Sequence, residues 1–382
     1  MVPIYFDYNA TTTLDPAVRV AMLPFFDEIW GNPSSVHQIG RRARALLDDA
    51  RERVATVLGA KPSEVVFTSG GTESSNLAIF GTARLLRAKG RHLVTSTIEH
   101  HAVLHCFRYL EKHEGFEVTY VPVDAAGVVS LDAVARALRP DTTLVSIMAA
   151  NNELGTLQPV AAIGALCRSR GIIFHTDAVQ AFGKLPFTSI GQFNADLVSI
   201  CAHKFHGPKG AGALYIKSPL LPDPIVFGGA HENERRAGTE NLPAIIGFTE
   251  AAERFIRQPV FPAEVLWLLT RRLQSLAETI PGVTIRGSQL ERLPNTVALS
   301  VTGCDSIVLL AGLDMVGICA SSGSACAAGS LEPSHVLLAL GVPEAEANSL
   351  IRFSLGRAST EAEVAVVERE LPGIIRRIRG WN

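Results

Sequence analysis

The sequence lacks the features that mark several large classes of protein. It contains no run of about 18 apolar residues, which a membrane-spanning helix needs. Its six cysteines include no Cys-x-x-Cys pair, so neither a disulfide scaffold nor a zinc knuckle is indicated, and we expect reduced thiols and no metal site. Lys and Arg total 35 against 37 Asp and Glu. This balance offers no broad positive field, so we expect no direct nucleic-acid partner and no membrane partner.

The first residues, MVPIYFDYNA, lack a basic segment followed by an apolar stretch, which favours a cytoplasmic protein. We find no internal repeat, and the only low-complexity tract is SSGSACAAGS. The 47% hydrophobic and 19% charged residues indicate a folded soluble protein and exclude disorder over most of the length. At 382 residues, two or three domains are expected.

From about residue 63 onward, short β-branched runs alternate with segments of helical periodicity. This rhythm predicts a large α/β domain with a mixed, mostly parallel seven-stranded sheet covered by helices on both faces. After Pro259 the pattern changes to a smaller α+β domain. In such sheets ligands bind at the carboxyl ends of the strands. The expected strands of the large sheet are 64–69, 92–97, 117–123, 142–149, 172–178, 197–202 and 212–216.

Chemistry-bearing residues follow three of these strands. Gly71 and Thr72 stand where a strand enters a helix, which suits an anion, although a tight turn capped by Thr72 explains them equally well. Asp177 ends another strand, with His175 two residues earlier on the same face. The HxD pair is compatible with a helix cap, with an acid that pairs with a protonated ring nitrogen, or with a metal ligand pair.

Lys204 follows a third strand in a turn rich in glycine and proline. A lone lysine there is usually a solvated charge, but a lysine that forms a Schiff base needs such a fixed position. A phosphate at Gly71 and Thr72, a ring nitrogen at Asp177 and an aldehyde at Lys204 together describe pyridoxal phosphate. His100, at the end of the TSTIE run, is then positioned to stack on the ring.

Cys326 differs from the other cysteines because GSACAAG contains no bulky apolar residue to bury it. A cysteine flanked by glycines is suited to delivering a thiolate. The remaining cysteines lie in apolar or helical contexts and are interpreted as small buried hydrophobes.

Nine sequence blocks are spread over nearly the whole chain: SGGTESSN, EHHAV, NNELGTLQP, HTDAVQAFGK, AHKFHGPKGAGALY, GGAHENERRAGTEN, SSGSAC, EPSHVLLALG and IRFSLGR. In order as well as content, they resemble the cysteine desulfurases of the NifS/IscS group. That resemblance implies a fold-type I, class V aminotransferase-like homodimer that uses pyridoxal phosphate to convert L-cysteine to L-alanine and holds the sulfur as a persulfide on Cys326.

The resemblance also implies a role for each matching residue. Lys204, His100 and Cys326 would be catalytic. Asn152 and Arg352 would hold the substrate carboxylate, with Asn9 and Ala10 beside them. The cofactor would be bound by Gly71, Thr72, His100, Asn152, Asp177, Gln180, Cys201, His203 and Lys204, and by Thr239, which would reach the phosphate of the neighbouring subunit.

By the same resemblance, residues 1–14 associate with the small domain, 15–256 form the cofactor domain, and 257–382 form the small domain with the cysteine loop at about 321–333. The chain departs from the family at Cys201, where a serine is usual and where a thiol donates a hydrogen bond poorly. The implied partners are an iron–sulfur scaffold or another sulfur acceptor, and Cys326 would ligate an iron–sulfur cluster in such a complex. A selenocysteine lyase, another class V transferase and a non-catalytic scaffold are the alternatives.

Overall fold

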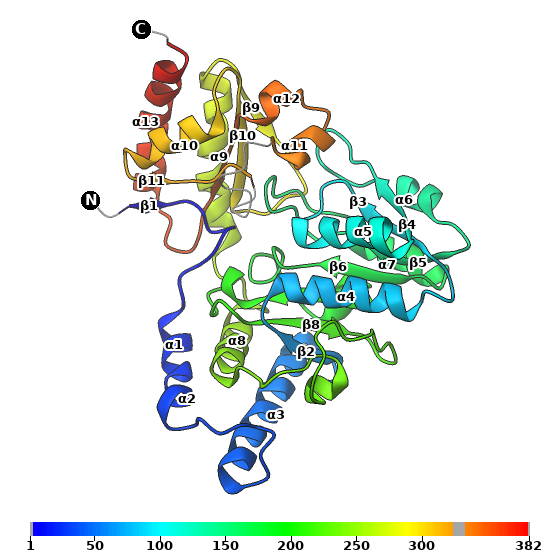
Figure 1. The fold of residues 1–382 in the computed structure, drawn as a ribbon. Coiled ribbons are helices and arrows are strands. Elements are labelled where there is room, and N and C mark those ends of the chain that lie inside the picture. The colour runs from blue at the N-terminus through cyan, green and yellow to red at the C-terminus, as the bar shows by residue number, and fades with distance from the viewer. Residues whose placement is uncertain (1–2, 324–332, 381–382) are drawn as a thin grey trace.

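The computed structural model describes residues 3–323 and 333–380 (Figure 1). Its strands form a seven-stranded, a three-stranded and a two-stranded sheet. The large sheet occupies the lower right of Figure 1, and the three-stranded sheet lies above it with both ends of the chain nearby. The candidate site lies where the two meet.

The large sheet has the strand order β2-β8-β7-β6-β5-β3-β4. β8 is antiparallel to both of its neighbours, and the other neighbouring pairs are parallel. The predicted seven-stranded, mostly parallel α/β sheet is therefore confirmed. The strands are β2 (Val65–Thr68), β3 (His92–Ser96), β4 (Glu117–Val121), β5 (Thr142–Ser146), β6 (Ile173–Asp177), β7 (Leu197–Cys201) and β8 (Gly212–Ile216).

Helices cover both faces of this sheet because alternate strand residues point to opposite sides. Val65 and Phe67 join a core with five helices, whereas Val66 and Leu93 face the other two. On the first face lie α1 (Pro16–Met22), α3 (Gln38–Leu58), α6 (Leu131–Ala137), α7 (Val160–Ser169) and α8 (Leu242–Phe255), with the short α2 (Pro24–Asp27) after α1; on the second lie α4 (Gly71–Leu85) and α5 (His101–Glu114).

The three-stranded sheet is antiparallel, in the order β12-β10-β9. One face packs on three long helices in a second core, and the other contacts Met148 and Leu154 of the large unit. Its elements are β9 (Val283–Arg286), β10 (Thr296–Val301), β12 (Leu350–Ser354), α9 (Ala263–Thr279), α10 (Ser306–Asp314) and α13 (Glu361–Ile378), with α11 (His335–Ala339) and α12 (Glu344–Ala347) on the second face.

The N-terminal segment connects the two units. β1 (Ile4–Tyr5) pairs in parallel with β11 (Ile318–Cys319), and Asp7 then forms a bridge with Ser354 of β12. Figure 1 shows the chain running from β1, beside α13, down to α1 on the large unit. Residues 6–15 therefore pass between the two sheets, beside the cavity described next.

Candidate active site

A cavity opens at the carboxyl ends of the large-sheet strands, under the three-stranded sheet. It holds about 760 Å³ of empty space, including the open space at its mouth, which is within the usual size for a small-molecule site. Every predicted site residue that the structure describes lines it, except Thr239. Met148, Ala150 and Val179 add apolar walls.

One end of the cavity is suited to an anion. α4 begins at Gly71, so the unpaired backbone N–H groups of its first turn and the positive end of its dipole lie here. Its N-cap is Gly70, at φ +152°, a conformation open to glycine, so the interpretation of Thr72 as the cap is wrong. The Gly71 and His203 backbone N–H groups also face the Cys201 sulfur, whose pKa is raised by burial. These donors fit a phosphate group.

Asp177 forms the floor of the cavity. Its carboxylate accepts a hydrogen bond from the Val179 backbone N–H at 3.0 Å, and the side chain is buried. Burial raises the pKa of Asp177 to about 6, although that hydrogen bond and the charge of Lys204 oppose the rise. A buried carboxylate of this kind is stabilised by a cationic partner, and a protonated pyridine nitrogen fits that requirement.

His175 does not form a metal site with Asp177. Its Nδ1 lies 2.8 Å from the Ser146 hydroxyl and its Nε2 2.9 Å from the Ser199 hydroxyl, so both ring nitrogens are engaged. Burial lowers the pKa of His175 to about 3, and the ring is therefore neutral. Among the described residues, no group of three or more His, Cys, Asp or Glu side chains could hold a metal ion.

Lys204 and His100 face the same cavity. Lys204 Nζ donates to the backbone carbonyls of Asn9 at 2.7 Å and Ala10 at 2.8 Å. His100 caps α5, with its Nδ1 accepting from the Ala102 N–H at 3.1 Å. Burial, assisted by the charge of Lys204, lowers the pKa of His100 to about 4. The imidazole is therefore neutral near pH 7 and carries its proton on Nε2.

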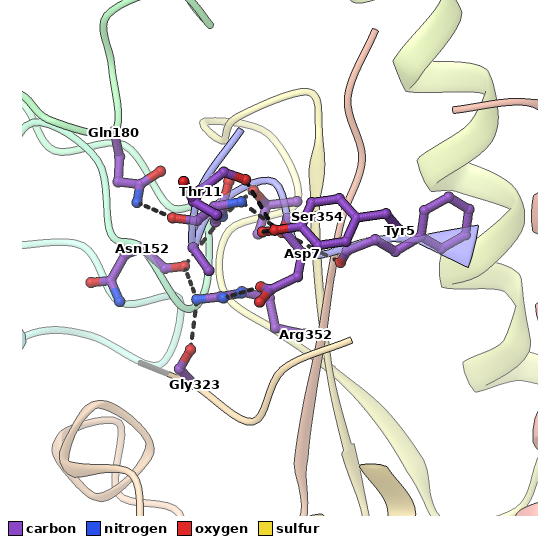
Figure 2. A network of polar contacts seen from close by, with 12 residues as sticks. Tyr5, Asp7, Thr11, Asn152, Gln180, Gly323, Arg352 and Ser354 are labelled. Atoms are coloured by element: carbon purple, nitrogen blue, oxygen red, sulfur yellow. Dashed lines mark hydrogen bonds and ion pairs between the residues drawn. The ribbon is translucent and has the colours of Figure 1, made fainter. Parts of the chain in front are cut away.

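Arg352 lines the cavity from β12 of the three-stranded sheet, and Figure 2 shows its polar contacts. Its Nη1 donates to the carbonyls of Asn152 at 2.9 Å and Gly323 at 2.6 Å, and its Nη2 pairs with Asp7 at 2.7 Å. The guanidinium is 1% exposed, and its buried Nε has no hydrogen-bond partner in the described parts of the chain. An unsatisfied N–H on a buried cation is a direct indication of a missing acceptor.

The sequence did not indicate Asp7 or Lys184. Asp7 pairs with Arg352 across 345 positions of the chain, and its only signal was its place beside Asn9 in the N-terminal segment. Lys184 is buried against Asn9 and Gln180. A lysine within the apolar run QAFGKLPF was the available signal, because lysine is rarely buried without a specific partner.

Two predicted site residues remain. Thr239 does not line this cavity but a separate hollow, together with Ser69 and Gly210. Cys326 lies outside the described residues. No helix within 3–323 or 333–380 is long and apolar enough to cross a membrane.

The aminotransferase class-V profile matches residues 4–367. The chain belongs to the aminotransferase class-V family. This class-V chain is 46% identical over 379 residues to the cysteine desulfurase IscS of Methanosarcina thermophila, which covers 99% of the chain and 93% of that relative. A solved NifS-like protein is 38% identical, with a TM-score of 0.88 and 99% of each chain covered. The solved SspA in complex with cysteine is 37% identical, with a TM-score of 0.81, covering 94% of this chain and 100% of SspA.

This class-V chain is an enzyme that depends on pyridoxal phosphate, and its fold is that of the NifS-like fold-type I proteins. The cavity agrees with that cofactor on its own chemistry. It offers a helix N-terminus for a phosphate, a buried carboxylate for a ring nitrogen and a lysine amine for an aldehyde.

Proposed function

We propose that this enzyme is a cysteine desulfurase, which converts L-cysteine to L-alanine and keeps the sulfur as a persulfide on Cys326. The observation that carries the proposal is one cavity lined by Lys204, a buried Asp177 and Arg352. These three groups match the aldehyde and ring nitrogen of the cofactor and the carboxylate of an amino acid. The relatives named cysteine desulfurase support cysteine as that amino acid.

The cofactor would be held by groups already described. Gly71, Thr72 and His203 would bind the phosphate, Asp177 the ring nitrogen and Lys204 the aldehyde. When bound, pyridoxal phosphate provides an electron sink for the bonds at the α-carbon of an amino acid. His100 would stack on the ring, and its neutral imidazole offers the Nε2 proton toward the cavity.

Arg352 and Asn152 would orient the substrate through its carboxylate. Among the described residues the Arg352 Nε has no hydrogen-bond partner, whereas Nη2 is already paired with Asp7. The positive charge of the Arg352 guanidinium is therefore already partly neutralised by Asp7 when the substrate binds. Lys204 Nζ, held at two backbone carbonyls, would remove the proton from the substrate α-carbon and return a proton to the product.

Sulfur transfer would be the task of Cys326. Its thiolate attacks the sulfur of the substrate, so that an S–S bond forms and the Cβ–S bond breaks. The electron pair of the broken bond stays on Cβ, which takes up a proton to complete the methyl group of alanine. L-cysteine and the enzyme thiol thus become L-alanine and an enzyme persulfide, with no external oxidant or reductant.

The assembly and partners also belong to this proposal. Thr239 would complete the phosphate site of a second copy, which makes the functional unit a homodimer. The sulfur would pass to an iron–sulfur scaffold or another acceptor protein, and Cys326 would ligate a cluster within such a complex. The cytoplasm is the expected compartment, because its reducing conditions keep protein thiols such as that of Cys326 from forming stable disulfides. The proposal also includes the domain division, in which residues 1–14 associate with the small domain, residues 15–256 form the cofactor domain and residues 257–382 form the small domain.

The direct test combines two measurements on the purified holoenzyme. Borohydride reduction and peptide mapping should place a pyridoxyl label on Lys204. Mass spectrometry after treatment with L-cysteine should find one extra sulfur atom, removable by reductant, on the peptide that contains Cys326. Cys326→Ser should keep the Lys204 label but gain no sulfur and make no alanine. Undiminished alanine formation by Cys326→Ser would show that a lyase expelling sulfur directly is the better description.

A further inference from the structure

The turn after β6 buries a lysine that the proposed reaction does not use. Lys184 is 2% exposed, and its Nζ donates to Asn9 Oδ1 at 2.7 Å and to Gln180 Oε1. Both acceptors belong to residues that line the cavity, whereas Lys184 itself lies behind them. A buried lysine is unfavourable unless its hydrogen bonds are specific, so simple packing is a poor explanation for this residue.

Lys184 determines which end of the Gln180 amide faces the cavity. Lys184 Nζ donates to the Gln180 oxygen, so the Gln180 Nε2 faces away from the lysine. One N–H of that Nε2 donates to the Asn9 backbone carbonyl at 3.0 Å, and Figure 2 shows the side chain directed at the N-terminal segment. Gln180 lines the cavity, and its Nε2 has a second N–H beyond the one that Asn9 accepts.

The same lysine fixes Asn9. The Asn9 Oδ1 accepts from both Lys184 and Asn295, so its Nδ2 is turned toward the Asn152 carbonyl at 3.2 Å. The Asn9 backbone carbonyl then accepts from Lys204 Nζ and Gln180 Nε2 together. The charges around Lys184 are those of Lys204, Arg352 and Asp7, and burial with the first two lowers the pKa of Lys184 well below its usual value. A neutral amine still has two N–H groups for its two acceptors.

We propose that Lys184 is a positioning residue, which holds the Gln180 amide with its N–H toward the cofactor and the Asn9 carbonyl toward Lys204. The inference rests on the proposed function, because the acceptor for this N–H would be the ring oxygen of pyridoxal phosphate. Without Lys184 the Gln180 amide is free to turn its oxygen toward the cofactor, where it would repel the ring oxygen of pyridoxal phosphate.

The test uses Lys184→Met, which keeps an unbranched side chain one atom shorter and removes its donors. We expect the holoenzyme to bind pyridoxal phosphate about tenfold more weakly, in line with a lost hydrogen bond at a partly charged ligand atom. The visible absorption band of the bound cofactor should also shift its pH midpoint upward, because a donor at the ring oxygen eases loss of the proton shared with Lys204. Lys217→Met makes the same change at a lysine 41% exposed, paired with Asp196, and should alter neither quantity.

A double-mutant cycle separates positioning from general support of the fold. In a Gln180→Ala background no amide remains to be oriented, so Lys184→Met should weaken cofactor binding by less than about twofold. Lys184→Gln, which keeps an NH2 donor group on a shorter side chain, should show about a threefold loss in the native background. Thermal melting of the cofactor-free proteins reports whether each variant folds, and Lys184→Gln carries the test if Lys184→Met does not.

Each outcome bears on a different statement. Unchanged binding in a folded variant, or a full effect that persists in the Gln180→Ala background, overturns the positioning role alone. A wild type without a pyridoxyl label on Lys204 overturns the proposed function and this inference with it.

Discussion

The two ends of the cavity are built in different ways. At the cofactor end, Asp177 and Lys204 follow neighbouring strands of one sheet and are placed by local chain geometry. At the carboxylate end, Arg352 comes from the three-stranded sheet, Asn152 from the large unit and Asp7 from the N-terminal segment. The first end follows from sheet topology, whereas the second exists only once three distant segments have packed together.

This difference leads to an expectation about function. Groups at the sheet edge act on the reacting bonds, so their loss should abolish chemistry. Groups at the assembled end orient a carboxylate, so their loss should alter binding more than bond making. The four substitutions below test that contrast.

Lys204→Ala should have the largest effect. We expect alanine formation to fall about 10³-fold or more, because the variant lacks both the amine that binds the aldehyde and the base at the α-carbon. Initial rates of alanine release measure the loss. Lys209→Ala changes an exposed lysine of the same loop and serves as the control. A rate for Lys204→Ala within tenfold of wild type would remove this residue from the chemistry.

Asp177→Asn should lower activity by about 100-fold, because an amide does not stabilise a protonated ring nitrogen. It should also stabilise the cofactor-free protein. Burial raises the pKa of Asp177 to about 6 from the ordinary 3.8, so the folded state binds this proton more tightly than the unfolded state. The contribution of Asp177 to the free energy of unfolding therefore falls as pH rises from about 4 to 6, by on the order of 2–3 kcal/mol.

Urea unfolding of the cofactor-free Asp177→Asn protein and wild type at pH 7.5 and pH 4 measures this effect. The variant should gain stability at pH 7.5 and lose that advantage at pH 4. An equal difference at both pH values would show that Asp177 is not the titrating group.

Cys201→Ser should improve cofactor retention about fivefold, because a hydroxyl donates to the phosphate better than a thiol. Cofactor loss during dialysis, followed by absorbance, compares the two proteins. Cys304→Ser makes the same change at a buried cysteine of the small unit and should leave the rate of loss unchanged. Faster loss from Cys201→Ser would mean that the sulfur packs against the cofactor without bonding to it.

Asp7→Asn should have the smallest effect of the four substitutions, and it should strengthen ligand binding at the carboxylate end. Asparagine keeps an oxygen near Arg352 Nη2 but removes the negative charge of Asp7. The positive charge of Arg352 then interacts more strongly with the substrate carboxylate. We expect about threefold tighter inhibition by L-alanine with kcat changed less than twofold. Asp15→Asn, at an acid that pairs with Arg357 outside the cavity, is the matched control. Weaker alanine binding would instead show that the Asp7 carboxylate is needed to hold Arg352 in its binding position.

The sequence predicted the sheet, because strand runs are local. The residues that it placed at strand ends line one cavity, because the carboxyl ends of neighbouring parallel strands meet at one edge. Arg352 was identified through the family resemblance, since nothing in LIRFS indicates which cavity its arginine enters. Asp7 and Lys184 were not identified, because their partners lie far away or behind the lining. α3 was also not predicted, although Ala43, Leu47, Ala50 and Val54 follow one buried helical stripe and Gly59, at φ +67°, ends it.

The position of Asn9 has a consequence for synthesis on the ribosome. Its backbone carbonyl meets Lys204 only after 195 further residues, and its backbone N–H meets the Ser354 hydroxyl after 345. Since translation adds residues from the N-terminus at a limited rate, the large sheet can fold while the carboxylate end is still incomplete. A nascent chain released before Ser354 therefore lacks the last of the contacts that hold Asn9, the one to the Ser354 hydroxyl. Capture of the cofactor in its final geometry thus reports that nearly the whole chain has been made.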